Sequence, residues 1–171
     1  MSTSMSQSLL PEFDHEMANT RKVLERVPED RPDYRPHPKS MTIARLAGHL
    51  TDIPWWAVTT LTRDEYDMQP VGGSTRERYM MTTREALLTR FDAEVAAARA
   101  ALAATSDAAL MQPWTLKHGG HTIFSMPRAS ALRSFVLNHN VHHRAQLGVY
   151  LRLNDVAVPS IYGPSADEGG L

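Results

Sequence analysis

Cysteine is absent from the 171 residues of this chain. Without a thiol, the protein has no disulfide, no thiolate metal site and no cysteine nucleophile. Any nucleophile or metal ligand must therefore come from another residue type or from a second molecule. The lack of disulfides also favours a cytoplasmic location.

Net charge is nearly absent as well, because 18 basic and 19 acidic residues leave a formal charge of −1. Such a balance provides no basic surface of the kind that binds nucleic acid or an anionic membrane. No window approaches the ~18 to 20 apolar residues that a membrane helix needs. Residues 1–8 lack the basic start and apolar run of a signal peptide. We therefore expect a soluble cytoplasmic protein without nucleic-acid or membrane partners.

Apolar side chains make up 42% of the chain, enough for one domain with a core over residues 1–171. Along four segments they recur at spacings of three, four and seven, which is the pattern of a buried helix face. Pro28 ends the first segment, and Ser40 is a suitable N-cap for the second. Thr82 begins a capping box before the third, and Pro127 suits the first turn of the fourth. The predicted fold is an all-α four-helix bundle, with helices at about 9–27, 41–63, 83–104 and 127–153.

Two connecting segments differ from the helices. Residues 64–81 are polar and contain Gly72 and Gly73, so we expect a loop there. Residues 114–124 carry Gly119 and Gly120 at their middle, which predicts a short hairpin or a folded loop just before the last helix.

Histidine, in contrast, is plentiful, with eight residues. His139 and His143 are four apart, so they project from one helix face, and they lie on its apolar stripe. Two unpaired imidazoles in a core would each cost roughly 1 to 3 kcal/mol. A shared metal ion or a dense polar network removes that cost. His142 also has a chelating spacing to His139, but it leans away from the stripe and is expected near the ligands or at the surface.

A third ligand is needed to complete such a site, and His49 is the best candidate. It lies on the inner face of the second helix, between Leu46 and Ile53. Three imidazoles with an open position are typical of a catalytic metal site. An all-nitrogen set suits zinc, nickel, iron, cobalt or copper. His118 and His121, which flank the predicted Gly-Gly turn, form a weaker alternative.

Several neighbours of these histidines are candidates for the surroundings of the site. Trp55 and Trp56 follow His49 by two turns and either pack in the core or form a wall of a substrate pocket. Asp52 either orients a ligand, pairs with Arg144 or makes a surface salt bridge. Tyr150 and Arg144, both on the last helix, are further candidates.

These residues resemble the DinB/YfiT-like metalloenzyme family. Residues 139–147 (HNVHHRAQL), followed by 150–152 (YLR), are similar to its H-x-x-H-H-R-G-Q-L … Y-L-R signature, with Ala145 in place of the usual glycine. Residues 46–49 (LAGH) match the position of the family's first ligand. Residues 36–40 (PHPKS) and 159–164 (PSIYGP) extend the similarity over most of the chain.

The resemblance implies a four-helix bundle that holds one divalent transition metal through His49, His139 and His143. It also implies a homodimer packed through the bundle helices. Characterised relatives include thiol-dependent S-transferases and a maleylpyruvate isomerase, and many members have no known activity.

An ion with an open position lowers the pKa of a bound thiol or water toward neutrality. We therefore expect zinc or nickel, together with a low-molecular-weight thiol and a small-molecule substrate. The leading hypothesis is a transferase that joins the thiol to an electrophile. The alternatives are a metal-dependent hydrolase and a non-catalytic, stress-associated metal-binding protein.

Overall fold

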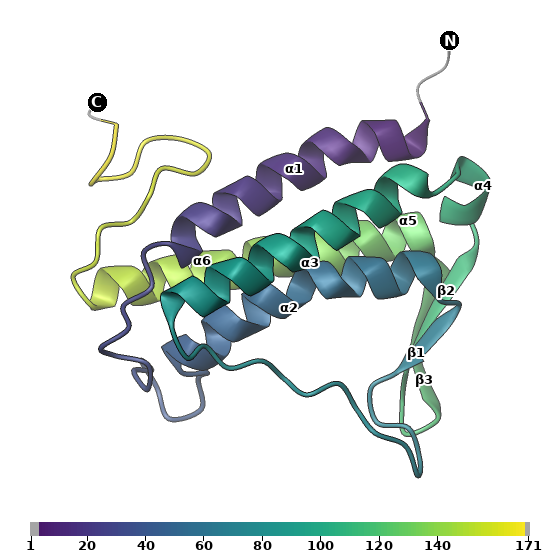
Figure 1. The fold of residues 1–171 in the computed structure, drawn as a ribbon, viewed down its shortest axis with the longest axis horizontal. Coiled ribbons are helices and arrows are strands. Elements are labelled where there is room, and N and C mark those ends of the chain that lie inside the picture. The colour runs from purple at the N-terminus through teal and green to yellow at the C-terminus, as the bar shows by residue number, and fades with distance from the viewer. Residues whose placement is uncertain (1–3, 170–171) are drawn as a thin grey trace.

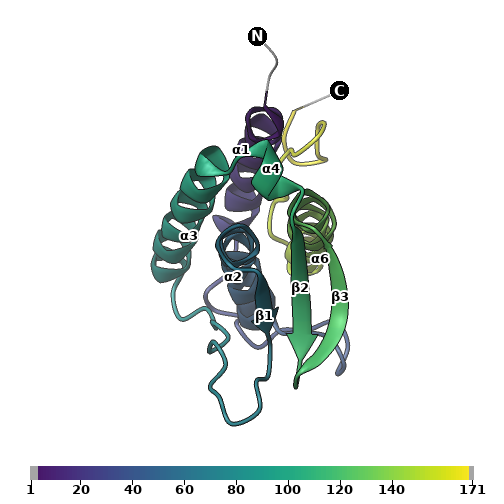
Figure 2. The same ribbon diagram turned by 90° about the vertical axis from the view of Figure 1, so that its right-hand side faces the viewer.

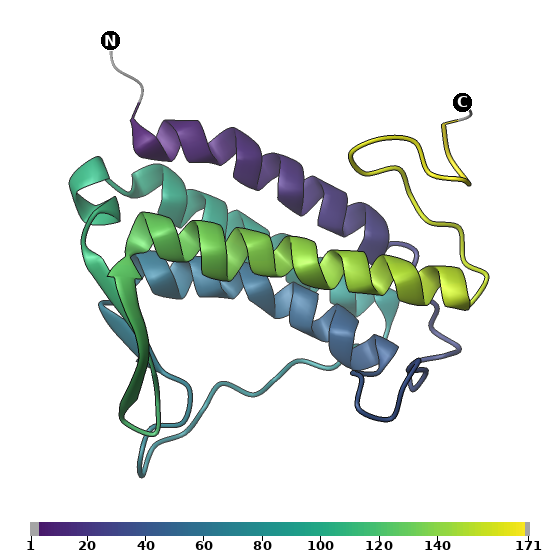
Figure 3. The ribbon, with the colours of Figure 1, turned by 180° about the vertical axis from the view of Figure 1, so that it is seen from behind.

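The computed structural model describes residues 4–169. Four long helices lie alongside one another and form most of the fold (Figure 1). They are α1 (Met5–Leu24), α2 (Ile43–Thr62), α3 (Arg84–Ala104) and α6 (Asn138–Leu153). The shorter helices are α4 (Asp107–Leu110), α5 (Arg128–Ala131) and the π-helix η1 (Leu132–Leu137). Figure 3 shows that α5, η1 and α6 form one continuous rod, so the predicted fourth helix contains an unpredicted π-helical segment.

Helix α1 begins and ends earlier than the apolar periodicity predicts. Ser4 forms a capping box with Gln7, in which each side chain accepts a hydrogen bond from the other residue's backbone N–H. This box adds a turn whose side chains carry little apolar signal. At the other end, the N–H of Val27 donates to the carbonyl of Leu24 in a tight turn, so Val27 stays buried although the helix has ended.

The N-caps of α2 and α3 also differ from the prediction. Thr42, not Ser40, accepts a hydrogen bond from the backbone N–H of Arg45 at 3.2 Å. Thr83, not Thr82, caps α3. Each predicted residue has the same capping chemistry as the true one, so residue type alone did not identify the position at which the backbone turns into the helix.

The structure is mostly helical, as predicted, but it also contains a three-stranded sheet, so the all-α prediction is confirmed only in part. Strands β2 (Pro113–His118) and β3 (His121–Pro127) form the hairpin that the Gly119-Gly120 pair predicts, and both glycines have positive φ. Strand β1 (Glu65–Asp67) pairs with β2 in parallel, within the segment expected to be a loop. Three residues are too few to show the alternation of apolar and polar side chains that is typical of a strand. Their pairing also depends on β2, which lies almost fifty residues later in the sequence.

Residues 68–83, named the strap here, lead from β1 back along α2 to the start of α3 (Figure 1). The backbone N–H of Tyr79 donates to the carboxylate of Asp52 on α2 at 3.1 Å. A Cβ added at Gly48 would lie 2.2 Å from the carbonyl oxygen of Tyr79, closer than van der Waals contact. Glycine at position 48 therefore permits the strap to lie directly against α2.

Two groups of apolar side chains hold these parts together. The larger fills the space between the long helices. The smaller, built on Trp114, Leu116 and Ala131, lies under the sheet, and Phe135 packs against it. Figure 2 shows β2 and β3 beside α6, with β1 close to α2. The sheet, the strap, α2 and the helical rod thus surround one region at this end of the molecule. Within residues 4–169, no helix is both long and apolar enough to cross a membrane.

Candidate metal centre

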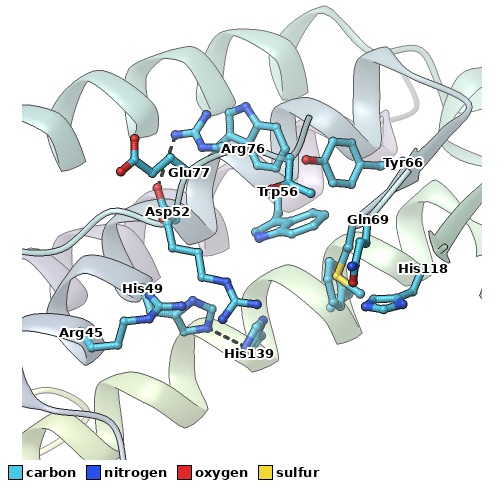
Figure 4. Close-up of a pocket in the computed structure, with 15 residues that line it drawn as sticks. Arg45, His49, Asp52, Trp56, Tyr66, Gln69, Arg76, Glu77, His118 and His139 are labelled. Atoms are coloured by element: carbon cyan, nitrogen blue, oxygen red, sulfur yellow. Dashed lines mark hydrogen bonds and ion pairs between the residues drawn. The ribbon is translucent and has the colours of Figure 1, made fainter. Parts of the chain in front are cut away.

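Three histidines from two helices meet in this region: His49 on α2, and His139 and His143 on α6. The Nε2 atom of His139 lies 3.1 Å from that of His49 and 2.9 Å from that of His143. One nitrogen from each ring lies within 4.8 Å of the other two. Figure 4 shows His49 and His139 facing each other. The sequence predicted this set, and the structure brings all three together.

All three imidazoles are held in the neutral form. Burial, reinforced by the charges of neighbouring histidines and arginines, lowers the pKa of His49 to about 3. Burial and the neighbouring His143 lower the pKa of His139 to about 4. Burial also lowers the pKa of His143. At neutral pH these rings therefore offer lone pairs, the form that a metal requires.

The three rings do not satisfy one another by hydrogen bonding. A neutral Nε2 atom either donates through its one hydrogen or accepts at its one lone pair. The Nε2 of His139 faces two other Nε2 atoms at hydrogen-bond distance, so one of these contacts has no matched donor and acceptor. A metal ion that accepts one lone pair from each ring removes this mismatch. The residues present thus fit a metal with three nitrogen ligands.

The orientation of His143 is fixed by a neighbour on its own helix. Its Nδ1–H donates to the side-chain oxygen of Gln146 at 2.7 Å. Because Nδ1 carries the hydrogen, the lone pair of the neutral ring lies on Nε2, which points toward the other histidines. This arrangement is typical of a metal-binding imidazole whose other nitrogen holds the ring in place.

A cavity of about 540 Å³ lies beside the histidines (Figure 4). It is enclosed by α2, the strap, the sheet and the helical rod. Its lining includes two of the three histidines, an aromatic group and several charged side chains. These lining residues include Arg45, His49, Asp52, Trp55, Trp56, Tyr66, Arg76, Glu77, Arg78 and His139.

One face of α2 provides much of this lining. Arg45, His49, Asp52 and Trp56 follow one another at spacings of four, three and four, which places them on the same side of the helix. Arg45 was absent from the sequence-based candidates, although the same periodicity that selected His49 includes it. The helical spacing could therefore have identified Arg45 as a residue on the same face as His49.

Aromatic rings form the wall of the cavity farther from the histidines. Trp55, Trp56 and Tyr66 contact one another edge to face, with ring centroids 5.0 to 5.2 Å apart. The guanidinium of Arg76 lies 4.4 Å from the ring of Trp55. Both tryptophans line the cavity, and Trp56 also packs against the two apolar groups of the core.

Asp52 has other partners than the one considered from the sequence. Its Oδ1 lies 3.3 Å from Arg76 and 3.2 Å from Arg90, and its Oδ2 accepts from the backbone of Tyr79. The suggested pairing with Arg144 was wrong. The two arginines come from the strap and α3, segments for which the sequence offered no link to α2. Asp52 thus anchors the strap beside the cavity.

Of the remaining candidates, His118 lines the cavity from β2, whereas Arg144, Tyr150 and His142 do not. Arg144 is buried on the side of α6 that faces α1, where it pairs with Glu16 at 2.7 Å. The hydroxyl of Tyr150 donates to the carbonyl of Met41 at 3.2 Å. His142 is exposed beside His143, in agreement with the preference for His143 as the metal ligand.

Comparison with solved structures finds the same fold in two bacterial proteins. A DinB-like protein from Bacillus cereus matches with a TM-score of 0.69 and 21% identity, over 95% of this chain and 100% of that chain. A DinB-like protein from Bacillus subtilis matches with a TM-score of 0.67 and 15% identity, over 92% of this chain and 99% of that chain. At these identities the likeness concerns the fold. A search among curated proteins finds no match.

The comparison with family models identifies the family. The model of the DinB superfamily matches residues 12–147, a span that begins in α1 and includes all three histidines of the candidate site. Because this match covers well over half of the sequence, the chain belongs to the DinB superfamily.

Proposed function

We propose that this protein binds one divalent transition metal ion through His49, His139 and His143. We further propose that it uses the ion to join a small thiol to an electrophilic small molecule. The observation that carries the metal is the convergence of three neutral Nε2 atoms that no pattern of hydrogen bonds satisfies. Three nitrogen ligands favour zinc or nickel over magnesium or calcium.

When bound, such an ion supplies an open position that lowers the pKa of a thiol or a water molecule. The chain's own residues provide the rest. Gln146 holds His143 in the ligating tautomer, and the aromatic wall provides an apolar surface for a substrate. The cavity volume of about 540 Å³ lies in the range of small-molecule sites.

The absence of cysteine supports an external thiol as the nucleophile. In the proposed reaction, the thiol loses its proton and its sulfur forms a bond to the electrophilic carbon. A leaving group departs with its electron pair, or a double bond opens and its carbon gains a proton. Hydrolysis is the alternative in which water replaces the thiol, and a metal-binding protein without turnover is the third possibility.

The metal is tested by elemental analysis of the purified protein. We expect about one ion per chain in the wild type and almost none in the His49→Ala/His143→Ala double variant. His142→Ala is the matched control, because this neighbouring histidine is exposed, and it should retain the ion. Equal metal content in the wild type and the double variant would show that the site is wrong.

The reaction is tested by incubating metal-loaded protein with a panel of small thiols and monochlorobimane. Conjugation that requires both a thiol and His143 supports the transferase. Hydrolysis of ester or amide probes with no conjugation supports the hydrolase. If neither occurs at full metal occupancy, the protein binds metal without turnover. The homodimer and the cytoplasmic location remain predictions from the sequence and the family resemblance.

A further inference from the structure

Two arginines beside the histidines have no negative partner. Arg45 lies one turn before His49 on α2, and its Nη1 atom is buried without a hydrogen-bond partner. Arg78 extends from the strap and lines the same cavity. Within residues 4–169, neither guanidinium is in ion-pair contact with a carboxylate.

The neighbouring arginines are different, because each is neutralised. Arg76 pairs with Asp52 at 3.3 Å and with Glu94 at 2.6 Å, and Arg90 pairs with the same oxygen of Asp52 at 3.2 Å. The other oxygen of Asp52 accepts from the backbone of Tyr79. Both oxygens of Asp52 are therefore engaged, although this is the buried carboxylate nearest to Arg45 along α2.

One further carboxylate lines the cavity, but at its other end. Figure 4 shows Glu77 on the side of Arg76, whereas Arg45 lies beside His49. Glu77 and Arg78 are both exposed, so solvent screens both of these charges, whereas Arg45 is half-buried. The end of the cavity next to the proposed metal thus holds one partly buried guanidinium, that of Arg45, without an ion-pair partner.

The buried Nη1 atom of Arg45 costs free energy unless a ligand accepts a hydrogen bond from it. Burial and, to a smaller extent, the charge of Arg78 lower the pKa of Arg45, although Asp52 acts in the opposite direction. A guanidinium presents a planar fork of donors that matches a carboxylate in two parallel hydrogen bonds. The aromatic wall on the far side would contact the apolar part of the same molecule.

We propose that the cavity takes a small molecule that carries a carboxylate, which Arg45 and Arg78 bind while the reactive atom lies next to the histidines. This inference rests on the proposed function, because it takes the cavity as the substrate site. The carboxylate belongs either to the thiol or to the electrophile, and the two sources are separated by experiment.

The test is isothermal titration calorimetry of metal-free protein with two matched pairs of probes. The thiol pair is N-acetylcysteine and its amide, and the electrophile pair is chloroacetate and chloroacetamide. The acid should bind about tenfold or more tightly than the amide in at least one pair, which is the usual effect of a charge-assisted hydrogen bond. The pair that shows the preference identifies the source of the carboxylate.

Variants then assign the preference to the two arginines. Arg45→Met and Arg78→Met should each reduce the acid-to-amide ratio, and the double variant should bring it close to one. Arg45→Lys keeps the charge and should retain part of the preference, which separates loss of the anion site from misfolding. Arg63→Met is the matched control, because Arg63 is the exposed C-cap residue that follows α2 and does not line the cavity.

Equal binding of acid and amide in both pairs would overturn the inference, as would no measurable binding of either acid. A preference that survives in the double variant would overturn it too. Because the titration uses metal-free protein without turnover, its result does not depend on whether the protein is a transferase. Conversely, turnover of neutral thiol and neutral electrophile at the same rate as the acids would leave the proposed function standing and reject the carboxylate.

Discussion

Helix α6 carries two polar clusters on neighbouring faces, one buried and one half-buried, and they differ in how their polar atoms are satisfied. Toward α1, Arg144 contacts Glu16 and Thr20, and Tyr162 donates to Glu16 at 2.7 Å. Asn140 exchanges hydrogen bonds with Thr20 at 2.8 and 3.1 Å. None of these side chains has a buried polar atom without a hydrogen-bond partner, and the group is named the arginine cluster here.

Toward α2, the three histidines face one another without a matched set of donors and acceptors. On α6, the residues of the two clusters are one position apart in the sequence. The polar atoms of the arginine cluster have hydrogen-bond partners, whereas the histidine cluster has nitrogen lone pairs without one. A buried polar cluster that satisfies itself stabilises the fold, whereas one that does not is suited to bind a ligand. The comparison is tested by perturbing each cluster in turn.

The largest expected effect is on the arginine cluster. Arg144→Met leaves the nearly buried carboxylate of Glu16 without its cation, and we expect a loss of about 3 to 5 kcal/mol in the free energy of unfolding. Urea denaturation measures this loss. Arg133→Met is the control, since its pair with Glu12 is exposed and should contribute only about 0 to 1 kcal/mol. Similar losses in both variants would mean that the cluster is no more than a surface ion pair.

The histidine cluster should respond to metal instead. Zinc or nickel at about a hundredfold excess over its dissociation constant should raise the free energy of unfolding by about 2.7 kcal/mol. His139→Ala should abolish this increase, whereas Arg144→Met should keep it despite its lower starting stability. Thermal denaturation with and without chelator measures both. An equal increase in His139→Ala would place the metal elsewhere.

In the metal-free protein, the histidine cluster should also make the free energy of unfolding depend on pH. The pKa values of about 3 for His49 and about 4 for His139 lie below the ordinary value near 6.5. Between these values the unfolded chain binds more protons than the folded one. Stability should therefore rise as the pH increases from about 4 to 6.5 and level off above it.

Denaturation of metal-free protein across this pH range measures the slope. His139→Asn should flatten it, because one group with a lowered pKa is gone. His121→Asn replaces an exposed histidine of β3, outside the cluster, and is the control. A slope that is identical in all three proteins would show that the histidine cluster is not its source.

The smallest expected effect concerns the hydroxyl of Tyr162. Tyr162→Phe removes its hydrogen bonds to Glu16 and Arg144 but leaves their direct contact at 2.7 Å. We expect a loss of about 0.5 to 1.5 kcal/mol by urea denaturation. A loss as large as that of Arg144→Met would mean that the tyrosine, rather than the ion pair, holds the arginine cluster together.

The sequence predicted the histidine cluster better than its surroundings. The spacing of His139 and His143 and the inner position of His49 are local helical signals that made the three residues candidates, and the family resemblance made His49 the expected third ligand. Arg144 lies only one position after His143, but that step rotates it by about 100° and turns it toward α1. Its role depends on Glu16, a partner 128 residues away that no local pattern indicates.

The parts that sequence analysis missed are those that depend on distant partners. Strand β1 exists because β2 pairs with it, and the strap is held by Asp52 and by the close approach at Gly48. The similarity of residues 159–164 to the family had no structural meaning by itself. The structure gives it one, because Tyr162 lies within this segment and reaches the arginine cluster.

The π-helix η1 has a consequence for how this protein can change during evolution. The N–H of Asn138 donates to the carbonyl of Arg133, five residues earlier, so this turn holds one residue more than an α-helical turn. That residue sets the rotation of His139 relative to Phe135 and the cluster under the sheet. We expect that a single deletion within η1 would restore an α-helix and turn the two α6 histidines away from His49. The candidate metal centre would then be lost through one deletion, with every histidine still present.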